Sequence, residues 1–198
     1  MLGTRDSKSS NSGIPPHESG NHKYTVPAIR HVSSNTYIMN SGPIAEFLEK
    51  TYPHPAVVPV DSGPAQEIAA RSRSSIGRAS QASLIPREIK ILSPRSQEYF
   101  RRTREEALGQ PLENLLAEEE QRWEAVKTEL QAINDLLLAT KSGKPYLLGS
   151  QPSSTDVFLG GALQSMRVID QGIFERVAQY PGYRAVYDSM VEFMDKRD

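Results

Sequence analysis

The sequence contains no cysteine. The chain itself therefore supplies no thiolate nucleophile, no thiolate metal ligand and no disulfide, so any sulfur chemistry must come from a bound molecule. No run approaches the roughly 18 consecutive apolar residues of a membrane span. The first residues, MLGTRDSKSSNSG, lack the apolar core of a signal peptide. These absences predict a cytoplasmic protein that does not enter a membrane and whose fold rests on packing.

An excess of charge of either sign is also absent, since 23 basic and 24 acidic residues give a net charge of -1. This balance predicts no general attraction to nucleic acid or to an anionic membrane. Basic residues do surround Tyr99 and Phe100 in the segment 86–106, a pattern that RNA contacts also use. Because the acidic residues 118–120 follow closely, we expect a surface salt-bridge network there instead. The four histidines show no metal-ligand spacing, so no metal site is expected.

The composition changes along the chain and predicts one small and one larger piece. Residues 1–21 are rich in Ser, Gly, Asn and Pro and are predicted to form a disordered or loop tail. Residues 22–53 form the small piece. The proline-rich residues 54–63 predict a linker, because proline can neither continue a helix nor donate to a sheet. Residues 64–198 have helical periodicity and predict an all-helical domain.

The small piece has the pattern of a hairpin followed by a helix. Tyr24–His31 and Thr36–Met39 favour β-structure and are separated by a short polar segment, which predicts an antiparallel pair of strands. Ser41 is predicted to cap a helix that ends near Tyr52. Proline in its first turn costs no hydrogen bond. Its apolar stripe consists of Ile44, Phe47 and Leu48.

The helical domain shows three strong local patterns. Apolar residues recur at helical spacing between Pro111 and Ala139, which predicts one long helix. Ser153 lies three residues before Asp156, and this spacing predicts a structural capping box rather than acid-base chemistry. Gly160 and Gly161 inside the following helix predict a close approach by another helix. The last helix is expected to turn inward Tyr183, Val186, Tyr187, Met190 and Phe193.

Two short stretches of the small piece could bind a ligand. The Val26-Pro27 peptide bond precedes a strand, and both a cis and a trans bond fit the local sequence. In the cis form, the amide and carbonyl of Val26 would be free to pair with an extended peptide as an added strand. At Asn40-Ser41 the hydroxyl of Ser41 and the first helical amides converge where the helix dipole is positive. A carboxylate or phosphate fits there, and so does a purely structural cap.

The order of these features resembles that of a known family. The chain is similar to the cytosolic glutathione transferases in the order of five features. These are the stretch VPAI, a hairpin, the stretch NSGPIAEFLEKTYP, a proline-rich linker and a helical domain whose central helix opens with SSTD. The segment 85–115 most resembles a fungal branch related to bacterial aryl-ether-cleaving (beta-etherase) enzymes. The resemblance covers about Tyr24 to the C-terminus. It implies an α+β, mostly α fold, with a partial thioredoxin-like N-terminal piece and an all-helical C-terminal domain.

The resemblance also implies a ligand and the residues that hold it. Val26 and Pro27 would hold the cysteinyl backbone of glutathione, the co-substrate. Asn40 and Ser41 would hold its γ-glutamyl carboxylate, and Asn40 stands where the family has an acidic residue that contacts the ligand's ammonium. An apolar electrophile would be the second partner, and a homodimer is expected. The first helix of the helical domain could contact the electrophile through Arg71, Ser75 and Ile76, and a structural or dimer-interface role for these three fits equally well.

One departure concerns the start of the domain. In the family, a strand, a helix and a second strand precede the Val-Pro turn, and the residue that activates the thiol lies at the end of that first strand or at the start of its helix. Only the polar residues 1–21 precede the turn here, so no catalytic residue is assigned. We therefore expect a truncated gene product, a misassigned start or a degenerate paralogue.

The function expected from the resemblance is the addition of glutathione to an electrophilic small molecule, or its transient use to isomerise or cleave one. Tailoring of a fungal secondary metabolite fits this chemistry. The alternative is a non-catalytic binding or scaffold protein that keeps the helical domain for association.

Overall fold

The computed structural model describes residue 24 and residues 26–54 and 63–194. These residues are mostly helical with one two-stranded sheet, so the predicted α+β, mostly α class is confirmed. The chain divides into two compact units, Met1–Ala56 and Val57–Asp198. The predicted tail, and the predicted linker except for its first and last residues, lie outside the described residues.

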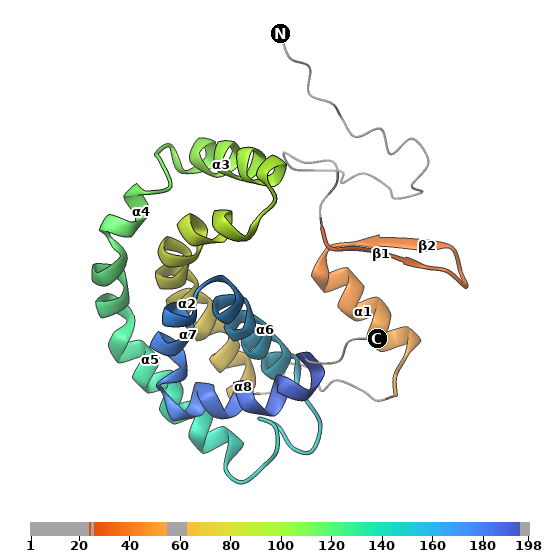
Figure 1. Ribbon diagram of the computed structural model, residues 1–198. Coiled ribbons are helices and arrows are strands. Elements are labelled where there is room, and N and C mark those ends of the chain that lie inside the picture. Colours follow the sequence, from red (N-terminus) through yellow and green to blue (C-terminus); the bar gives the residue numbers. More distant parts are fainter. Residues whose placement is uncertain (1–23, 25, 55–62, 195–198) are drawn as a thin grey trace. The chain divides into compact units, whose positions relative to one another are not determined.

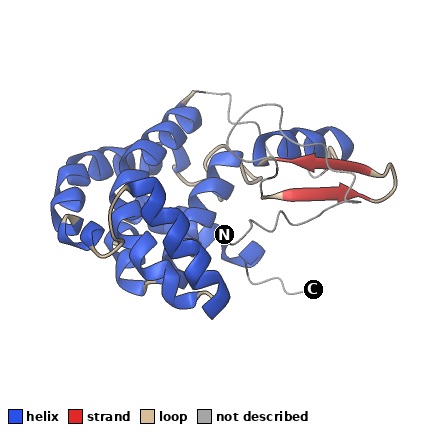
Figure 2. Cartoon of the chain, turned by 90° about the horizontal axis from the view of Figure 1, so that it is seen from above, coloured by secondary structure: helices blue, strands red, loops and turns tan. Residues whose placement is uncertain are grey.

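The sheet of the first unit is the predicted hairpin. Strands β1 (Ala28–His31) and β2 (Thr36–Met39), red in Figure 2, are antiparallel, with Ala28 opposite Met39. The first strand is shorter than predicted, because it begins at Ala28 and not at Tyr24. Asn35 ends the turn with a φ of 51°, a left-handed conformation that asparagine tolerates better than most residues.

Helix α1 (Ser41–Thr51) packs against both strands of the hairpin (Figure 1). Ile44 is its buried residue, while Leu48, predicted to face inward, is 42% exposed. Aromatic contacts hold the far end of the helix against β1. The ring of His31 makes edge contacts with the rings of Phe47 and Tyr52, and the Tyr52 hydroxyl lies 3.0 Å from His31 Nε2.

The second unit is helical throughout its described length. The predicted single helix from Pro111 to Ala139 is wrong, because Glu118, at φ -99° and ψ 0°, separates a short helix from a long one. Its elements are α2 (Pro64–Glu88), the 3-10 turn η1 (Ile89–Ile91), α3 (Pro94–Leu108), α4 (Asn114–Ala117), α5 (Glu119–Lys141), α6 (Ser154–Ile169), α7 (Gln171–Ala178) and α8 (Pro181–Met194).

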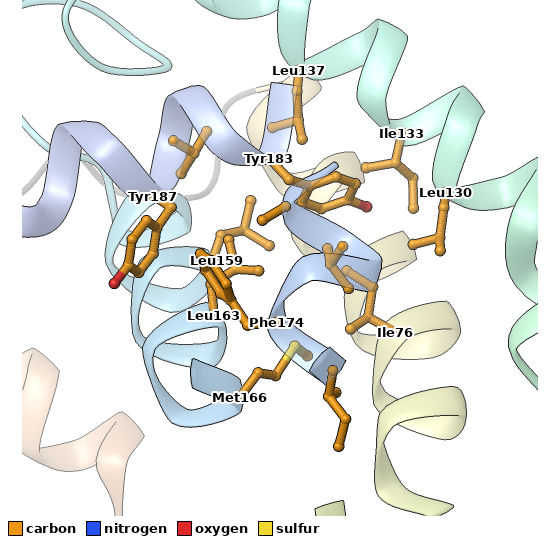
Figure 3. Packing of buried hydrophobic residues seen from close by; sticks show 14 of the residues in the cluster. Ile76, Leu130, Ile133, Leu137, Leu159, Leu163, Met166, Phe174, Tyr183 and Tyr187 are labelled. Atoms are coloured by element: carbon orange, nitrogen blue, oxygen red, sulfur yellow. The ribbon is translucent and has the colours of Figure 1, made fainter. Parts of the chain in front are cut away.

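Helix α6 lies at the centre of this unit and contacts α2, α7 and α8, while α2 packs along α5. Figure 3 shows how side chains from all five helices meet in one apolar cluster. Of the residues predicted to face inward on the last helix, four are buried and Phe193 is 42% exposed. The largest fully buried side chains of the unit include Ile68, Leu112, Ile133, Leu137, Leu147, Leu159, Leu163, Ile173, Val177, Tyr183 and Val186.

The predicted capping box opens α6. The amide of Asp156 donates to Ser153 Oγ at 3.2 Å, and Asp156 Oδ2 accepts from the Ser153 amide at 2.8 Å. Asp156 Oδ1 accepts a further hydrogen bond, at 3.1 Å, from the amide of Leu147 in the preceding loop. Both side chains are fully buried. These bonds confirm the structural role predicted for Ser153 and Asp156.

The predicted salt-bridge network is present in the basic segment. Arg101 pairs with Glu105 and Glu113 at 2.8 Å, and Arg87 pairs with Glu119 at 3.0 Å. Other arginines of this segment lie over aromatic rings instead, as Arg102 does over Tyr99. None of the helices in the described ranges is both long enough and apolar enough to span a membrane.

The two adjacent glycines of α6 have different surroundings. A Cβ on Gly160 would lie 2.9 Å from Cβ and Cγ of Met190 on α8, whereas a Cβ on Gly161 would meet nothing within 4 Å. The predicted close approach is therefore correct for Gly160 and wrong for Gly161. Only the first glycine is required by packing.

We predict that Gly160→Ala destabilises the protein by about 1–3 kcal/mol, because the added methyl group forces α6 and α8 apart. Gly161→Ala is the matched control and should stabilise the protein by about 0.5–1 kcal/mol, since alanine favours the helix and the space is open. Urea unfolding of the two variants and the wild type measures both effects. Equal effects of the two substitutions would contradict this packing.

Candidate functional site

Val26 and Pro27 lie immediately before β1. Their peptide bond is cis, one of the two alternatives that the sequence left open. Val26 is 91% exposed, and neither its amide nor its carbonyl has a backbone hydrogen-bond partner among the described residues. The main chain of Val26 is therefore accessible for pairing with an extended ligand.

Asn40 and Ser41 lie where β2 passes into α1, and the predicted cap is wrong. Asn40, at φ 72° and ψ 139°, is the N-cap residue, and Ser41 is the first residue of the helix. The Asn40 carbonyl accepts the first helical hydrogen bond, from the Ile44 amide at 3.0 Å. Because the left-handed turn at Asn40 completes the change of direction, Ser41 already lies within the helix, and no side chain caps its start.

A main-chain hydrogen bond joins the two candidate stretches. The amide of Asn40 donates to the carbonyl of Pro27 at 3.1 Å. This bond continues the ladder beyond the last strand pair, in which Ala28 lies opposite Met39. The structure therefore brings together all four residues that the sequence singled out, namely Val26, Pro27, Asn40 and Ser41.

The start of α1 favours an anion. The amides of Ser41 and Gly42 precede the first helical hydrogen-bond donor, so they have no partner within the helix, and Pro43 has no amide hydrogen. The first turn contains no acidic residue that would offset the positive end of the helix dipole. A carboxylate beside Ser41 would meet two amides and a hydroxyl.

A family assignment comes from the helical unit. Residues 69–185, more than half of the chain, match the family model of the glutathione S-transferase C-terminal domain. The chain belongs to the glutathione S-transferase family. It is also 29% identical, over 92% of its own length and 72% of the relative's, to the glutathione S-transferase-like protein ustS of Aspergillus flavus.

Solved glutathione transferases share the fold. GSTFuA3 of Phanerochaete chrysosporium superposes with a TM-score of 0.77 at 28% identity, over 96% of this chain and 79% of its own. CsGST63524 of Ceriporiopsis subvermispora, solved in complex with glutathione, gives a TM-score of 0.77 at 26% identity, over 97% and 81%. These similarities confirm a partial thioredoxin-like N-terminal piece and a helical C-terminal glutathione-transferase domain. The relation to the aryl-ether-cleaving branch stays a prediction.

The three residues considered for the second substrate are structural. Ile76 points into the apolar cluster beside Leu130 and Ile133 of α5 (Figure 3), and Ser75 is buried with its hydroxyl donating to the Arg71 carbonyl at 2.8 Å. Arg71 binds Glu129 on α5 through two nitrogens, at 2.7 and 3.0 Å. Of the two alternatives for these residues, the structural one is supported.

The same helix also has an exposed face. The side of α2 that faces solvent carries Arg73, Ser74, Gly77 and Arg78. Ile68 and Ile76 lie on the buried side of this helix, and the four exposed residues lie away from it. No cluster of three or more metal-ligating side chains occurs within residues 26–54 and 63–194.

The Arg71 pairing predicts a pH-dependent stability. The hydrogen bond from Arg71 lowers the pKa of Glu129 below its ordinary value. A carboxylate whose pKa is lower in the folded state stabilises the fold above its unfolded pKa, and this contribution is lost as the pH falls through the folded pKa. Arg71→Gln should therefore lower the free energy of unfolding by about 0.5–1 kcal/mol at pH 7, a small loss because the pair is partly exposed to solvent. The loss should be smaller at pH 3, where Glu129 is more often protonated.

Urea unfolding at the two pH values measures this difference. Lys127→Gln is the matched control, since Lys127 reaches Glu124 only at 3.4 Å with both side chains mostly exposed. This control should change little at either pH. An Arg71→Gln loss that stays the same at pH 3 would argue against the ion pair.

Proposed function

We propose that the protein binds glutathione through Val26, Pro27, Asn40 and Ser41 and uses it to modify an apolar electrophilic small molecule. The reaction would be conjugation, isomerisation or cleavage. We also propose a location in the cytoplasm, together with action in fungal secondary metabolism and as a homodimer, of which the last two rest on the family resemblance alone.

The observation that carries this proposal is the hydrogen bond from Asn40 to Pro27. It holds an exposed strand-like main chain at Val26 beside the positive end of α1 at Ser41. A peptide backbone suits the first, and a carboxylate suits the second. Glutathione offers both groups in one extended molecule. Solved relatives in complex with glutathione support the same ligand.

Asn40 suggests how tightly the ligand is held. An amide side chain can still accept a hydrogen bond from the ligand's ammonium, but it lacks the negative charge that would strengthen that bond. The grip on the γ-glutamyl end then rests on the Ser41 hydroxyl, the two free amides and the helix dipole. We therefore propose weaker binding of glutathione than an acidic residue at position 40 would give.

Glutathione supplies a thiol nucleophile. A free thiol with a pKa near 8.5 is mostly protonated at neutral pH, and the thiolate is the reactive form. Turnover therefore requires a nearby hydrogen-bond donor or positive charge. None of the four proposed contacts is assigned to the sulfur, so none of them is this donor or charge. This favours the second candidate function, a non-catalytic binding protein.

We predict that calorimetric titration detects glutathione binding to the full chain and that Ser41→Ala weakens it about tenfold, because a hydrogen bond to a charged carboxylate is lost. Ser93→Ala is the matched control. Ser93 caps α3 with its hydroxyl, so this change removes a helix-terminal hydroxyl in the other unit. Unchanged affinity in Ser41→Ala, or an equal loss in Ser93→Ala, would contradict the site.

We predict measurable conjugation of glutathione to a generic electrophile such as a chlorodinitrobenzene, with a higher KM for glutathione in Ser41→Ala. The Ser41 hydroxyl is proposed to contact the γ-glutamyl carboxylate of glutathione and not its reacting sulfur, so kcat should change less than KM. Steady-state kinetics at varied glutathione concentration measure both constants. Saturable binding without any turnover would favour the non-catalytic alternative.

A further inference from the structure

Lys141 is the last residue of α5, and its side-chain nitrogen is held by a neutral partner. The nitrogen donates to the carbonyl of Pro145, in the loop that leads to α6. Lys141 makes no ion pair with a carboxylate within residues 26–54 and 63–194. A lysine that lies partly out of water usually pairs with an acidic group, and Lys141 is half-buried without one.

The ring of Tyr146 lies beside this nitrogen. Its centroid is 5.8 Å from Lys141 Nζ. Tyr146 is itself fixed, because its hydroxyl donates to Glu192 of α8 at 2.9 Å and its amide donates to the Gly149 carbonyl at 3.1 Å. The ring and the loop carbonyl therefore take the place of part of the water that would otherwise surround the nitrogen.

This loss of water changes the charge state of Lys141. Desolvation lowers the pKa of Lys141 below its ordinary value, and the negative charge of the buried Asp156 on α6 opposes this effect without cancelling it. The other charged groups on the surrounding elements are Glu192, which is bonded to Tyr146, and Lys144. A lowered pKa leaves a larger fraction of the amine uncharged at neutral pH, and the uncharged amine is the nucleophilic form.

Lys144 offers an internal comparison three residues further along the chain. Its nitrogen also donates to a main-chain carbonyl, that of Thr140, at 3.1 Å. It likewise makes no ion pair in the part of the chain that the structure describes. Lys144 is exposed, however, whereas Lys141 is half-buried beside a ring. The two lysines thus share the type of hydrogen bond and differ in their contact with water.

We propose that Lys141 is a modification site, acylated by an activated acyl group that a thioester carries. The uncharged nitrogen forms a bond to the acyl carbon, the bond from that carbon to sulfur breaks, and the sulfur leaves as a thiolate. The proton that the nitrogen loses passes to solvent. The site lies wholly in the helical unit and does not depend on the proposed binding of glutathione.

The hydrogen bond to Pro145 favours an acyl group over an aldehyde. The amide product keeps one N–H, which still donates to the Pro145 carbonyl. A Schiff base formed with an aldehyde has no hydrogen on its uncharged nitrogen, so this bond would be lost. The amide also carries no charge, and acylation therefore removes the cost of keeping a partly desolvated ammonium group at this position.

Labelling of the full chain with phenyl thioacetate, a simple activated thioester, tests this site in the absence of glutathione. Mass spectrometry of the digested protein gives the acetylation rate of each lysine at low conversion. At pH 7 we expect Lys141 to react at least about threefold faster than Lys144, because more of its amine is uncharged. The ratio should approach one near the ordinary lysine pKa of about 10.4, and also in concentrated urea, where the surroundings of Lys141 are lost.

A pair of variants tests whether the ring shields the amine. Tyr146→Ala admits water to the nitrogen and should lower the ratio of the Lys141 rate to the Lys144 rate at pH 7 about twofold or more. Tyr99→Ala is the matched control, since Tyr99 is an exposed tyrosine on α3, and it should leave the ratio unchanged. Equal rates at Lys141 and Lys144 in the wild type at pH 7 would overturn the proposal. So would a ratio that persists in concentrated urea, or equal effects of the two tyrosine substitutions.

Discussion

The buried carboxylate of Asp156 fixes the start of the helix around which the helical unit is built. It accepts hydrogen bonds from the main chain of Ser153 and of Leu147, so it joins the beginning of α6 to the loop that follows α5. The adjacent Thr155 hydroxyl donates to the Ala65 carbonyl at 3.1 Å and ties α6 to the start of α2. Because α6 contacts α2, α7 and α8, the direction of this one helix determines where the others pack.

The N-terminal unit depends on far fewer contacts. Among its described residues Ile44 alone is buried, and a two-stranded sheet with one helix is marginal as an independent fold. Its best-defined feature is the main-chain hydrogen bond from Asn40 to Pro27, which holds together the residues proposed to bind glutathione. A site built largely from main-chain groups would tolerate a change of side chain at Asn40. The aromatic contacts of His31 then keep α1 on the hairpin.

Features with a local chemical signal could be predicted from the sequence. The hairpin and the capping box at Ser153 each depend on residues close together in the chain, and the structure confirms both, although the first strand begins at Ala28. The four ligand contacts at Val26, Pro27, Asn40 and Ser41 stay a prediction. The positive φ of Asn40 leaves no comparable signal in the sequence. The N-cap was therefore predicted at Ser41, one residue after its actual position. Gly160 and Gly161 are identical in sequence terms, and only the position of α8 distinguishes them. For Arg71, Ser75 and Ile76 the sequence left a substrate contact and a structural role open, and the packing of α2 against α5, which the structural role depends on, involves residues far away in the chain.

The central claim is that main-chain groups at two joined turns bind one glutathione molecule. Amide chemical shifts of the isotope-labelled full chain, recorded by NMR during a glutathione titration, test it most directly. The account predicts that the amides of Val26, Ser41 and Gly42 shift together and saturate at one concentration, while those of α2 and α6 stay in place. Saturating shifts confined to other residues, or none at Ser41, would contradict it.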